Sequence, residues 1–259
     1  MTNLRISLCQ TDCIWQDAPS NRRQLENKLA RLDPAETDLV LLPEMFTTGF
    51  SMESEKLAES MDGPSIRWLI ELSNQLNLAV TGSLIIKEHG GYYNRLCWVE
   101  PGLKSPKIYD KKHLFSLANE HKHFKPGNQK LILEYKGWKI ALFICYDLRF
   151  PVWSRNVEGV DLMIYVANWP EKRNLAWKSL LPARAIENQC YVAGVNRIGM
   201  DANQIQYCGD SAVYNYEGIQ ILKLEAQDTV QTIELNKQAL EVYKRAYPFL
   251  KDADRFQFE

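Results

Sequence analysis

The stretch Lys139-Ile-Ala-Leu-Phe-Ile-Cys-Tyr-Asp-Leu-Arg149 joins a hydrophobic strand to a reactive side chain. The run after Lys139 is continuously apolar, which is typical of a strand covered on both faces of its sheet. The run ends at Cys145, and charged residues follow at once. A cysteine is more often a small core residue than a chemical group, so Cys145 needs partners before it becomes a candidate for catalysis.

Strands of the same kind occur in two similar halves of the chain. Asp38-Leu-Val-Leu-Leu42 and Asp161-Leu-Met-Ile-Tyr-Val166 each place an aspartate before an apolar strand. A helical pattern follows each of them, and then a further strand, at 79–83 in the first half and at 191–196 in the second. The pattern predicts an α/β fold in which two sheets pack face to face with helices outside.

The remaining elements are predicted from hydrophobic periodicity. Residues 4–9 alternate as a half-buried strand does, and leucines at helical spacing from 25 to 32 predict a helix that Ser20 caps and that ends at Asp33-Pro34. Pro64 is expected to open a second helix, and others are expected around 176–188 and 237–246. Because no linker-like tract interrupts the chain, residues 1–259 are predicted to form one domain, whose tail from about 236 to 259 is a candidate for oligomer contacts.

Composition limits the classes of function. The 259 residues carry a formal net charge of −1, which gives no reason to expect nucleic acid or a membrane surface as a partner. Neither a secretory signal nor an apolar run of about 18 residues is visible, so a cytoplasmic location is expected. The six cysteines show neither a disulfide framework nor the paired spacing of a zinc site, and we expect no metal or other cofactor.

Reactive side chains follow three apolar segments, where the ligand of a helix-covered sheet is usually bound. They are Glu44, Lys111 and Cys145. A thiol needs a base or a cationic neighbour to become a nucleophile, and an oxyanion formed during acyl transfer needs fixed donors. Glutamate, lysine and cysteine can supply these three functions. A Cys-His pair is the alternative, but none of the four histidines lies in a known cysteine-protease signature.

Three motifs in order resemble the nitrilase (carbon-nitrogen hydrolase) superfamily. They are Leu42-Pro-Glu44, Tyr109-Asp-Lys-Lys-His-Leu-Phe115 and Ile144-Cys-Tyr-Asp-Leu-Arg-Phe150. The helical segment Ala183-Arg-Ala-Ile-Glu-Asn-Gln189 is also similar to that family. The resemblance runs from about Leu4 to the end of the chain. Tyr165-Val-Ala-Asn-Trp-Pro170 and the segment after Cys145 are most similar to the bacterial omega-amidase branch.

The resemblance implies a four-layer α-β-β-α sandwich and a Glu-Lys-Cys triad. In it, Glu44 is the general base, Lys111 holds the oxyanion together with the backbone N–H of Tyr146, and Cys145 is the nucleophile that forms a thioester. Glu120, which precedes Pro126-Gly127, corresponds to the family's second glutamate and is expected to orient Lys111 or water. Members of the family usually form homodimers or larger homo-oligomers.

The implied substrate is a small 2-oxo acid omega-amide such as 2-oxoglutaramate, which is hydrolysed to the acid and ammonia. A guanidinium suits its carboxylate, and the candidates are Arg149, Arg173 and Arg197, with Lys172 behind them. Phe50, Asn168 and Trp169 are further candidates for substrate contacts.

Alternatives remain open at this stage. They are a nitrilase, an N-carbamoyl amino acid amidase, an aliphatic amidase, a non-catalytic binding subunit and a thiol redox protein. The last two are disfavoured because the three motif residues are all present and no Cys-x-x-Cys accompanies Cys145.

Overall fold

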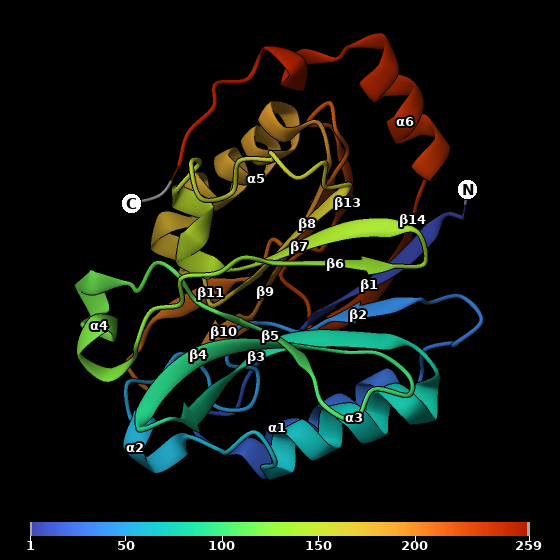
Figure 1. The fold of residues 1–259 in the computed structure, drawn as a ribbon. Coiled ribbons are helices and arrows are strands. Elements are labelled where there is room, and N and C mark those ends of the chain that lie inside the picture. Colours follow the sequence, from blue (N-terminus) through green and yellow to red (C-terminus); the bar gives the residue numbers. More distant parts are fainter. Residues whose placement is uncertain (1, 258–259) are drawn as a thin grey trace.

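Two six-stranded sheets pack face to face, with helices on their outer faces (Figure 1). The structure is a computed structural model that describes residues 2–257 of the chain. The first sheet has the strand order β14-β1-β2-β3-β4-β5. Its strands, in chain order, are β1 (Leu4–Gln10), β2 (Leu39–Leu41), β3 (Ala79–Glu88), β4 (Gly91–Val99), β5 (Lys107–Asp110) and β14 (Thr229–Leu235).

The second sheet repeats the arrangement of the first, with the order β13-β12-β9-β8-β7-β6. In each sheet three central strands are parallel and the outer pairs are antiparallel. The two-stranded ribbon of β10 and β11 lies beside them. These strands are β6 (Leu131–Tyr135), β7 (Trp138–Ile144), β8 (Leu162–Ala167), β9 (Tyr191–Asn196), β10 (Ile198–Met200), β11 (Gln206–Cys208), β12 (Ala212–Tyr214) and β13 (Gln220–Lys223).

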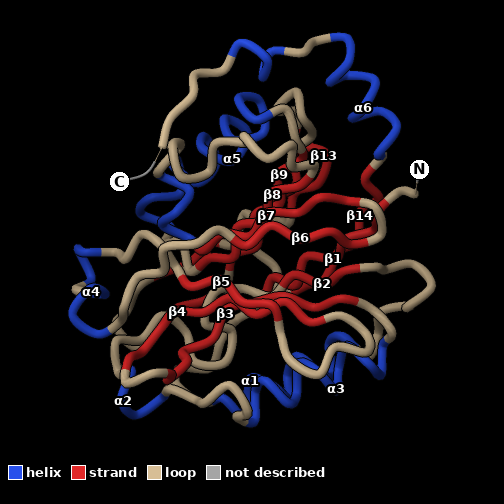
Figure 2. Tube along the Cα trace, in the orientation of Figure 1, coloured by secondary structure: helices blue, strands red, loops and turns tan. Residues whose placement is uncertain are grey.

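Helices form the two outer layers, as the tube in Figure 2 makes clear. Helices α1 and α3 cover the first sheet, and α5 packs on β9 and β12 of the second, with α6 beyond it. Together with the two sheets they make the expected four-layer sandwich. The α-helices are α1 (Ala18–Leu29), α2 (Ser54–Leu57), α3 (Pro64–Leu76), α4 (Glu120–His123), α5 (Asn174–Asn188) and α6 (Lys237–Ala246). Short 3₁₀ helices are η1 (Ser116–Ala118), η2 (Cys145–Arg149), η3 (Glu171–Arg173) and η4 (Phe249–Asp252).

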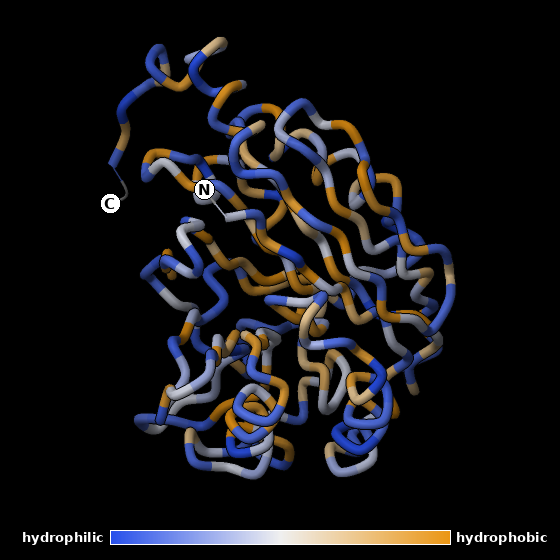
Figure 3. The backbone as a smooth tube through the Cα atoms, turned by 90° about the vertical axis from the view of Figure 1, so that its right-hand side faces the viewer, coloured by the Kyte–Doolittle hydropathy of each residue, from blue (hydrophilic) through white to orange (hydrophobic). Residues whose placement is uncertain are grey.

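Burial on both faces explains the continuously apolar strands. In β2, Leu39 and Leu41 belong to the core between the sheets, whereas Val40 belongs to the core beneath α1 and α3. Successive side chains of a strand point to opposite faces, so both faces of this sheet require apolar residues. Figure 3 shows hydrophobic stretches running through the sheets, between more hydrophilic outer segments.

The two aspartates that precede the parallel strands occupy equivalent positions. The carboxylate of Asp38 accepts from the backbone N–H of Arg5 at 2.8 Å, and that of Asp161 accepts from the N–H of Lys139 at 3.0 Å. Each aspartate also donates its own N–H to the carbonyl of the same neighbour. The repeat seen in the sequence therefore corresponds to two copies of one strand-starting arrangement.

The structure corrects the predicted start and end of the first helix. Asp17, and not Ser20, caps α1, since its side chain accepts from the N–H of Ser20 at 3.1 Å. The helix ends at Leu29, well before Asp33-Pro34. Leu32 still packs against the core beneath α1, which is why the apolar spacing continues beyond the helix. Among residues 2–257, no helix has the length and hydrophobicity to cross a membrane.

Candidate active site

The ends of four strands bring the predicted catalytic residues together. Glu44 follows β2, Lys111 follows β5, Cys145 follows β7 and Asn168 follows β8. β2 and β5 run in the same direction in the first sheet, and β7 and β8 are parallel in the second. Their carboxyl ends meet at one edge of the sandwich, where open α/β sheets usually bind ligands.

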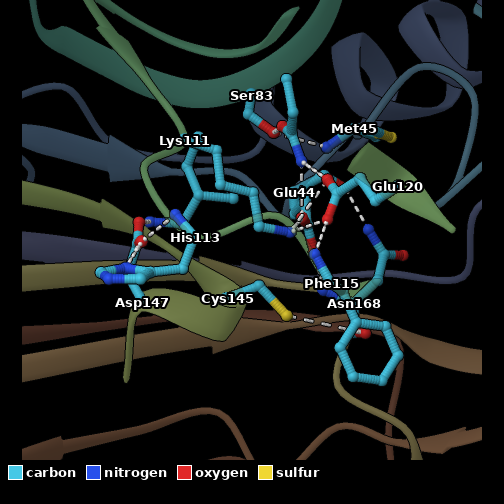
Figure 4. A network of polar contacts seen from close by, with 12 residues as sticks. Glu44, Met45, Ser83, Lys111, His113, Phe115, Glu120, Cys145, Asp147 and Asn168 are labelled. Atoms are coloured by element: carbon cyan, nitrogen blue, oxygen red, sulfur yellow. Dashed lines mark hydrogen bonds and ion pairs between the residues drawn. The ribbon is translucent and has the colours of Figure 1, made fainter. Parts of the chain in front are cut away.

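The ammonium of Lys111 lies between two carboxylates (Figure 4). Its Nζ is 2.9 Å from Oε1 of Glu44, and 3.1 and 3.0 Å from Oε1 and Oε2 of Glu120. All three side chains are at most 1% exposed. The backbone N–H of Phe115 also donates to Oε2 of Glu120 at 2.5 Å, so Glu120 is held on both sides.

Glu44 is oriented by two asparagines. Nδ2 of Asn94 donates to Oε1 of Glu44 at 2.7 Å, and the backbone N–H of Asn168 donates to Oε2 at 2.9 Å. Ser83 donates to Oδ1 of Asn94 and accepts from the N–H of Met45, each at 2.8 Å. The carboxylate thus has a fixed orientation, as a general base requires.

Cys145 lies at a strained turn at the end of β7. Its φ is +44°, a left-handed conformation that residues other than glycine rarely adopt. Its sulfur is 3.9 Å from the carbonyl oxygen of Asn168. Burial and the negative charge of Glu44 raise the pKa of the thiol well above its ordinary value, so the resting thiol carries its proton. The site must therefore supply a base.

The buried charges support one another. Burial alone would lower the pKa of Lys111, but the carboxylates of Glu120 and Glu44 outweigh it and raise that pKa, so the ammonium stays charged. Burial also raises the pKa of Glu120, against the opposing effect of Lys111. Lys111 carries one positive charge, whereas Glu44 and Glu120 can carry two negative charges between them. One carboxylate charge is therefore left to accept the proton of Cys145.

A cavity of about 510 Å³ opens onto Lys111 and Cys145. Its size suits a small organic molecule. Its lining combines aromatic rings, two arginines and the thiol of Cys145. The lining residues are Trp15, Gln16, Phe50, Ser51, Met52, Glu53, Lys111, Phe115, Ala118, Cys145, Tyr146, Arg149, Asn168, Trp169, Pro170, Arg173, Asp201, Asn203, Ile205 and Tyr207.

Two guanidinium groups line the cavity against aromatic rings. Arg149 lies 5.0 Å from the ring centre of Trp169, and Arg173 lies 4.9 Å from that of Phe115. Neither has a carboxylate partner within 4.0 Å among the residues that the structure describes. The ring of Phe50 lies 5.1 Å from the ammonium of Lys111 and closes the site on that side.

The other predicted cations lie elsewhere. Lys172 is exposed and does not line the cavity. Arg197 is fully buried outside the cavity lining and pairs with Asp12 at 2.8 Å. Arg149 pairs with neither of the nearby acids, since Asp147 is bound by other groups and Glu187 pairs with Arg184 at 2.8 Å.

Sequence reasoning missed the residues that orient the carboxylate of Glu44. Asn94 and Ser83 lie in the middle of β4 and β3 and are fully buried. The only signal was a polar residue inside each strand, and it is weak because the same strands also carry other polar residues, such as Thr81 and Arg95. Trp15 and Tyr207, which also line the cavity, carry no comparable signal. Within residues 2–257, no group of three His, Cys, Asp or Glu side chains is arranged to hold a metal ion.

Comparison with known proteins agrees with this geometry. The carbon-nitrogen hydrolase family model matches residues 5–245. The chain is 45% identical to omega-amidase YafV of Escherichia coli over 99% of both chains, and 30% identical to 2-oxoglutaramate amidase of Bacillus subtilis over 95% of this chain and 96% of the relative.

Solved structures show the same fold. XC1258 from Xanthomonas campestris, which carries an arsenic adduct in its active site, is 43% identical and superimposes with a TM-score of 0.97 over the whole of both chains. Nit3 of Saccharomyces cerevisiae, at 22% identity and a TM-score of 0.83, covers 95% of this chain and 94% of its own, and supports the fold alone. The chain belongs to the carbon-nitrogen hydrolase family, within the nitrilase superfamily.

Proposed function

We propose that this protein is an amidase that hydrolyses a small 2-oxo acid omega-amide, such as 2-oxoglutaramate, to the dicarboxylate and ammonia. The observation that carries the proposal is the cluster of Glu44, Lys111 and Cys145 beside a cavity lined by two guanidinium groups, neither of which has a carboxylate partner within residues 2–257. The names of two relatives, omega-amidase and 2-oxoglutaramate amidase, agree with that substrate class.

The first half of the reaction forms a thioester. Glu44 takes the proton of the Cys145 thiol, and the sulfur attacks the amide carbonyl carbon. The ammonium of Lys111 and the backbone N–H of Tyr146 stabilise the oxyanion that forms. The protonated Glu44 then donates its proton to the leaving nitrogen, the carbon–nitrogen bond breaks and ammonia departs.

The second half releases the acid. Glu44 removes a proton from water, and the resulting hydroxide attacks the thioester carbonyl. The same donors hold the second oxyanion, and the carbon–sulfur bond breaks as the thiol regains its proton. Glu120 keeps Lys111 directed at the oxyanion, which agrees with its two contacts at 3.0 and 3.1 Å.

Substrate selection is assigned to the cavity wall. Arg149 and Arg173 would bind the carboxylate of the substrate, because a planar guanidinium matches a carboxylate with two parallel hydrogen bonds. Phe50 and Trp169 would enclose the short carbon chain, and Asn168 would contact the reacting amide beside Glu44.

Ammonia release from a panel of compounds tests the proposal. The panel contains 2-oxoglutaramate, glutamine, asparagine, an N-carbamoyl amino acid and a simple nitrile. We expect the highest kcat/KM for 2-oxoglutaramate. Turnover of the carbamoyl compound or the nitrile alone would assign the protein to another branch of the superfamily, and no turnover of any compound would reject the amidase.

Two further properties are proposed with it. The protein forms a homodimer or larger homo-oligomer, and the exposed aromatic side chains of Tyr247 and Phe249 in the C-terminal tail support this. It is located in the cytoplasm, a proposal supported by six cysteines that are all free thiols. Neither nucleic acid nor a membrane is proposed as a partner.

A further inference from the structure

A buried carboxylate joins the two segments that carry the proposed oxyanion donor and nucleophile. Asp147 lies two residues after Cys145 and is completely buried. Its Oδ2 accepts from the backbone N–H of Ile144 at 3.0 Å and from the hydroxyl of Tyr109 at 2.7 Å. The first contact lies at the end of β7 and the second in β5.

The other oxygen of Asp147 binds the segment after Lys111. Oδ1 is 3.0 Å from the backbone N–H of His113 and 2.8 Å from Nδ1 of its ring, as Figure 4 shows. Together the contacts occupy the acceptor sites of a carboxylate. Among the described residues, no lysine or arginine pairs with Asp147.

The contacts of Asp147 lie on both sides of Lys111 and of Cys145 in the sequence. Tyr109 and His113 stand two residues before and two residues after Lys111, and Ile144 and Asp147 enclose Cys145. A left-handed residue other than glycine is strained and persists only where its surroundings impose that conformation. The hydrogen bonds to Asp147 supply such surroundings at Cys145.

Packing supports the same arrangement. The ring of His113 stacks on Phe150 with ring centres 3.8 Å apart and an angle of 8°. The hydroxyl of Tyr109 accepts from Nε1 of Trp153 at 3.0 Å, and burial raises the pKa of Tyr109 well above its usual range, so this residue remains a neutral donor to Asp147.

We propose that Asp147 is a positioning residue: it fixes the turn that bears Cys145 and the N–H of Tyr146 against the segment that bears Lys111. The inference rests on the catalytic roles assigned above to Cys145 and Lys111. A displacement of about 1 Å at such a site costs on the order of 100-fold in rate. Asp147 therefore acts through the other residues, without touching the substrate.

The test compares Asp147→Asn with Asp38→Asn. Asp38 is a matched control, since it is buried, accepts from a strand N–H at 2.8 Å and precedes β2, at the opposite end of that strand from Glu44. We measure kcat and KM for 2-oxoglutaramate and the melting temperature of each variant. We also measure the rate at which iodoacetamide alkylates Cys145, and mass spectrometry of the peptide that contains Cys145 is the readout.

For Asp147→Asn we expect kcat to fall about 100-fold while KM changes about threefold or less. Alkylation should slow about tenfold or more, because the thiol is no longer aligned with Glu44. Asp38→Asn should lower the melting temperature and leave kcat and alkylation close to those of the unchanged protein. A kcat within about threefold for Asp147→Asn, or an equal loss of kcat in both variants, would overturn the inference.

Two provisions keep the test decisive. If Asp147→Asn does not fold, Tyr109→Phe removes one of the contacts to Asp147 and keeps the ring. A smaller loss of kcat, about tenfold, is then expected at constant KM. If the unchanged protein hydrolyses no amide, the proposed function fails, and the alkylation rate decides on Asp147 separately. A rate that is unchanged or higher in the variant would then reject its positioning role.

Discussion

The buried ammonium of Lys111 is shared by Glu44 and Glu120, so its removal affects both rate and stability. For Lys111→Met we expect kcat to fall about 100- to 1,000-fold, because the proposed oxyanion donor is lost. The variant also leaves two buried acids facing each other without a cation, which we expect to cost about 3–5 kcal/mol of unfolding free energy.

The loss of stability in Lys111→Met should depend on pH. Without the cation, the two acids favour a protonated carboxyl, and burial already raises the pKa of Glu120. A raised carboxyl pKa stabilises the folded state at low pH, and the contribution is lost as pH rises. In urea unfolding, the free energy of unfolding of Lys111→Met should therefore lie further below that of the unchanged protein at pH 8 than at pH 5. Lys112→Met is the control, and an equal deficit at both pH values would contradict the argument.

The two guanidinium groups of the cavity predict a change in KM. Arg149→Ala and Arg173→Ala should each raise KM for 2-oxoglutaramate about 10- to 100-fold, since each loses a charged hydrogen bond to the carboxylate. Hydrolysis of a neutral aliphatic amide should change little. Lys172→Ala removes one positive charge outside the cavity lining. An equal rise in KM in that variant would indicate long-range attraction of the substrate by positive charge instead of direct contact with Arg149 and Arg173.

Single residues differ in how far the sequence reveals them. Glu44, Lys111 and Cys145 stand in motifs, and the structure brings them together at the wall of one cavity, which Lys111 and Cys145 line. Asn94 is fifty residues from Glu44, and only the pairing of β3 with β4 places it there. The pairing of Arg197 with Asp12 likewise depends on contacts between distant segments, which no local pattern predicts.

At the scale of elements, the aspartates before the parallel strands should make the stability of the folded state depend on pH in the acid range. Although burial opposes it, hydrogen bonds from Arg5 and Lys136 lower the pKa of Asp38 to about 2. A lowered pKa stabilises the folded state above the unfolded value of about 4. That contribution is lost as pH falls from about 4 to about 2.

Unfolding curves between pH 2.5 and 6 measure the contribution of Asp38. Asp38→Asn should be less stable than the unchanged protein at pH 6, and the two should converge as pH falls. Curves that remain parallel over this range would show that the Asp38 carboxylate does not stabilise the strand. Asp161, whose pKa is also lowered, is expected to behave similarly in the second sheet.

The helices and strands followed from the sequence where periodicity was strong, as in the helices at Pro64 and at 237–246. The start of α1 did not, because Asp17 and Ser20 are both good capping residues and the choice depends on the local backbone. Pro19 in the first turn is the signal that favours Asp17. The short η2 at Cys145 depends on tertiary contacts and has no periodic signature.

At the scale of the molecule, the C-terminal tail predicts self-association. Tyr247 is 51% exposed and Phe249 is 59% exposed, and their rings lie 5.8 Å apart at the end of α6. Light scattering should give a mass of at least twice 30.0 kDa. Changing both residues to Asp should reduce it to the monomer, whereas Ile108→Asp on β5 should not; a monomer before any change would contradict the prediction.

The face-to-face packing of the sheets was predictable because the chain repeats its strand–helix–strand pattern with an aspartate at each start. The two aspartates make the same backbone hydrogen bonds, and each sheet has six strands. What the sequence did not reveal is the position of the tail, whose last two residues lie outside the described part of the chain. Its contacts depend on surfaces far away in the sequence.

The central claim is that one thiol, activated by Glu44 and Lys111, breaks the carbon–nitrogen bond of an amide. The most direct measurement is ammonia release from 2-oxoglutaramate by the unchanged protein and by Cys145→Ala, with the melting temperature as a check on folding. We predict steady release with an equal amount of 2-oxoglutarate from the first and none from the second, at similar melting temperatures. Ammonia release by Cys145→Ala at a rate close to that of the unchanged protein would contradict the claim.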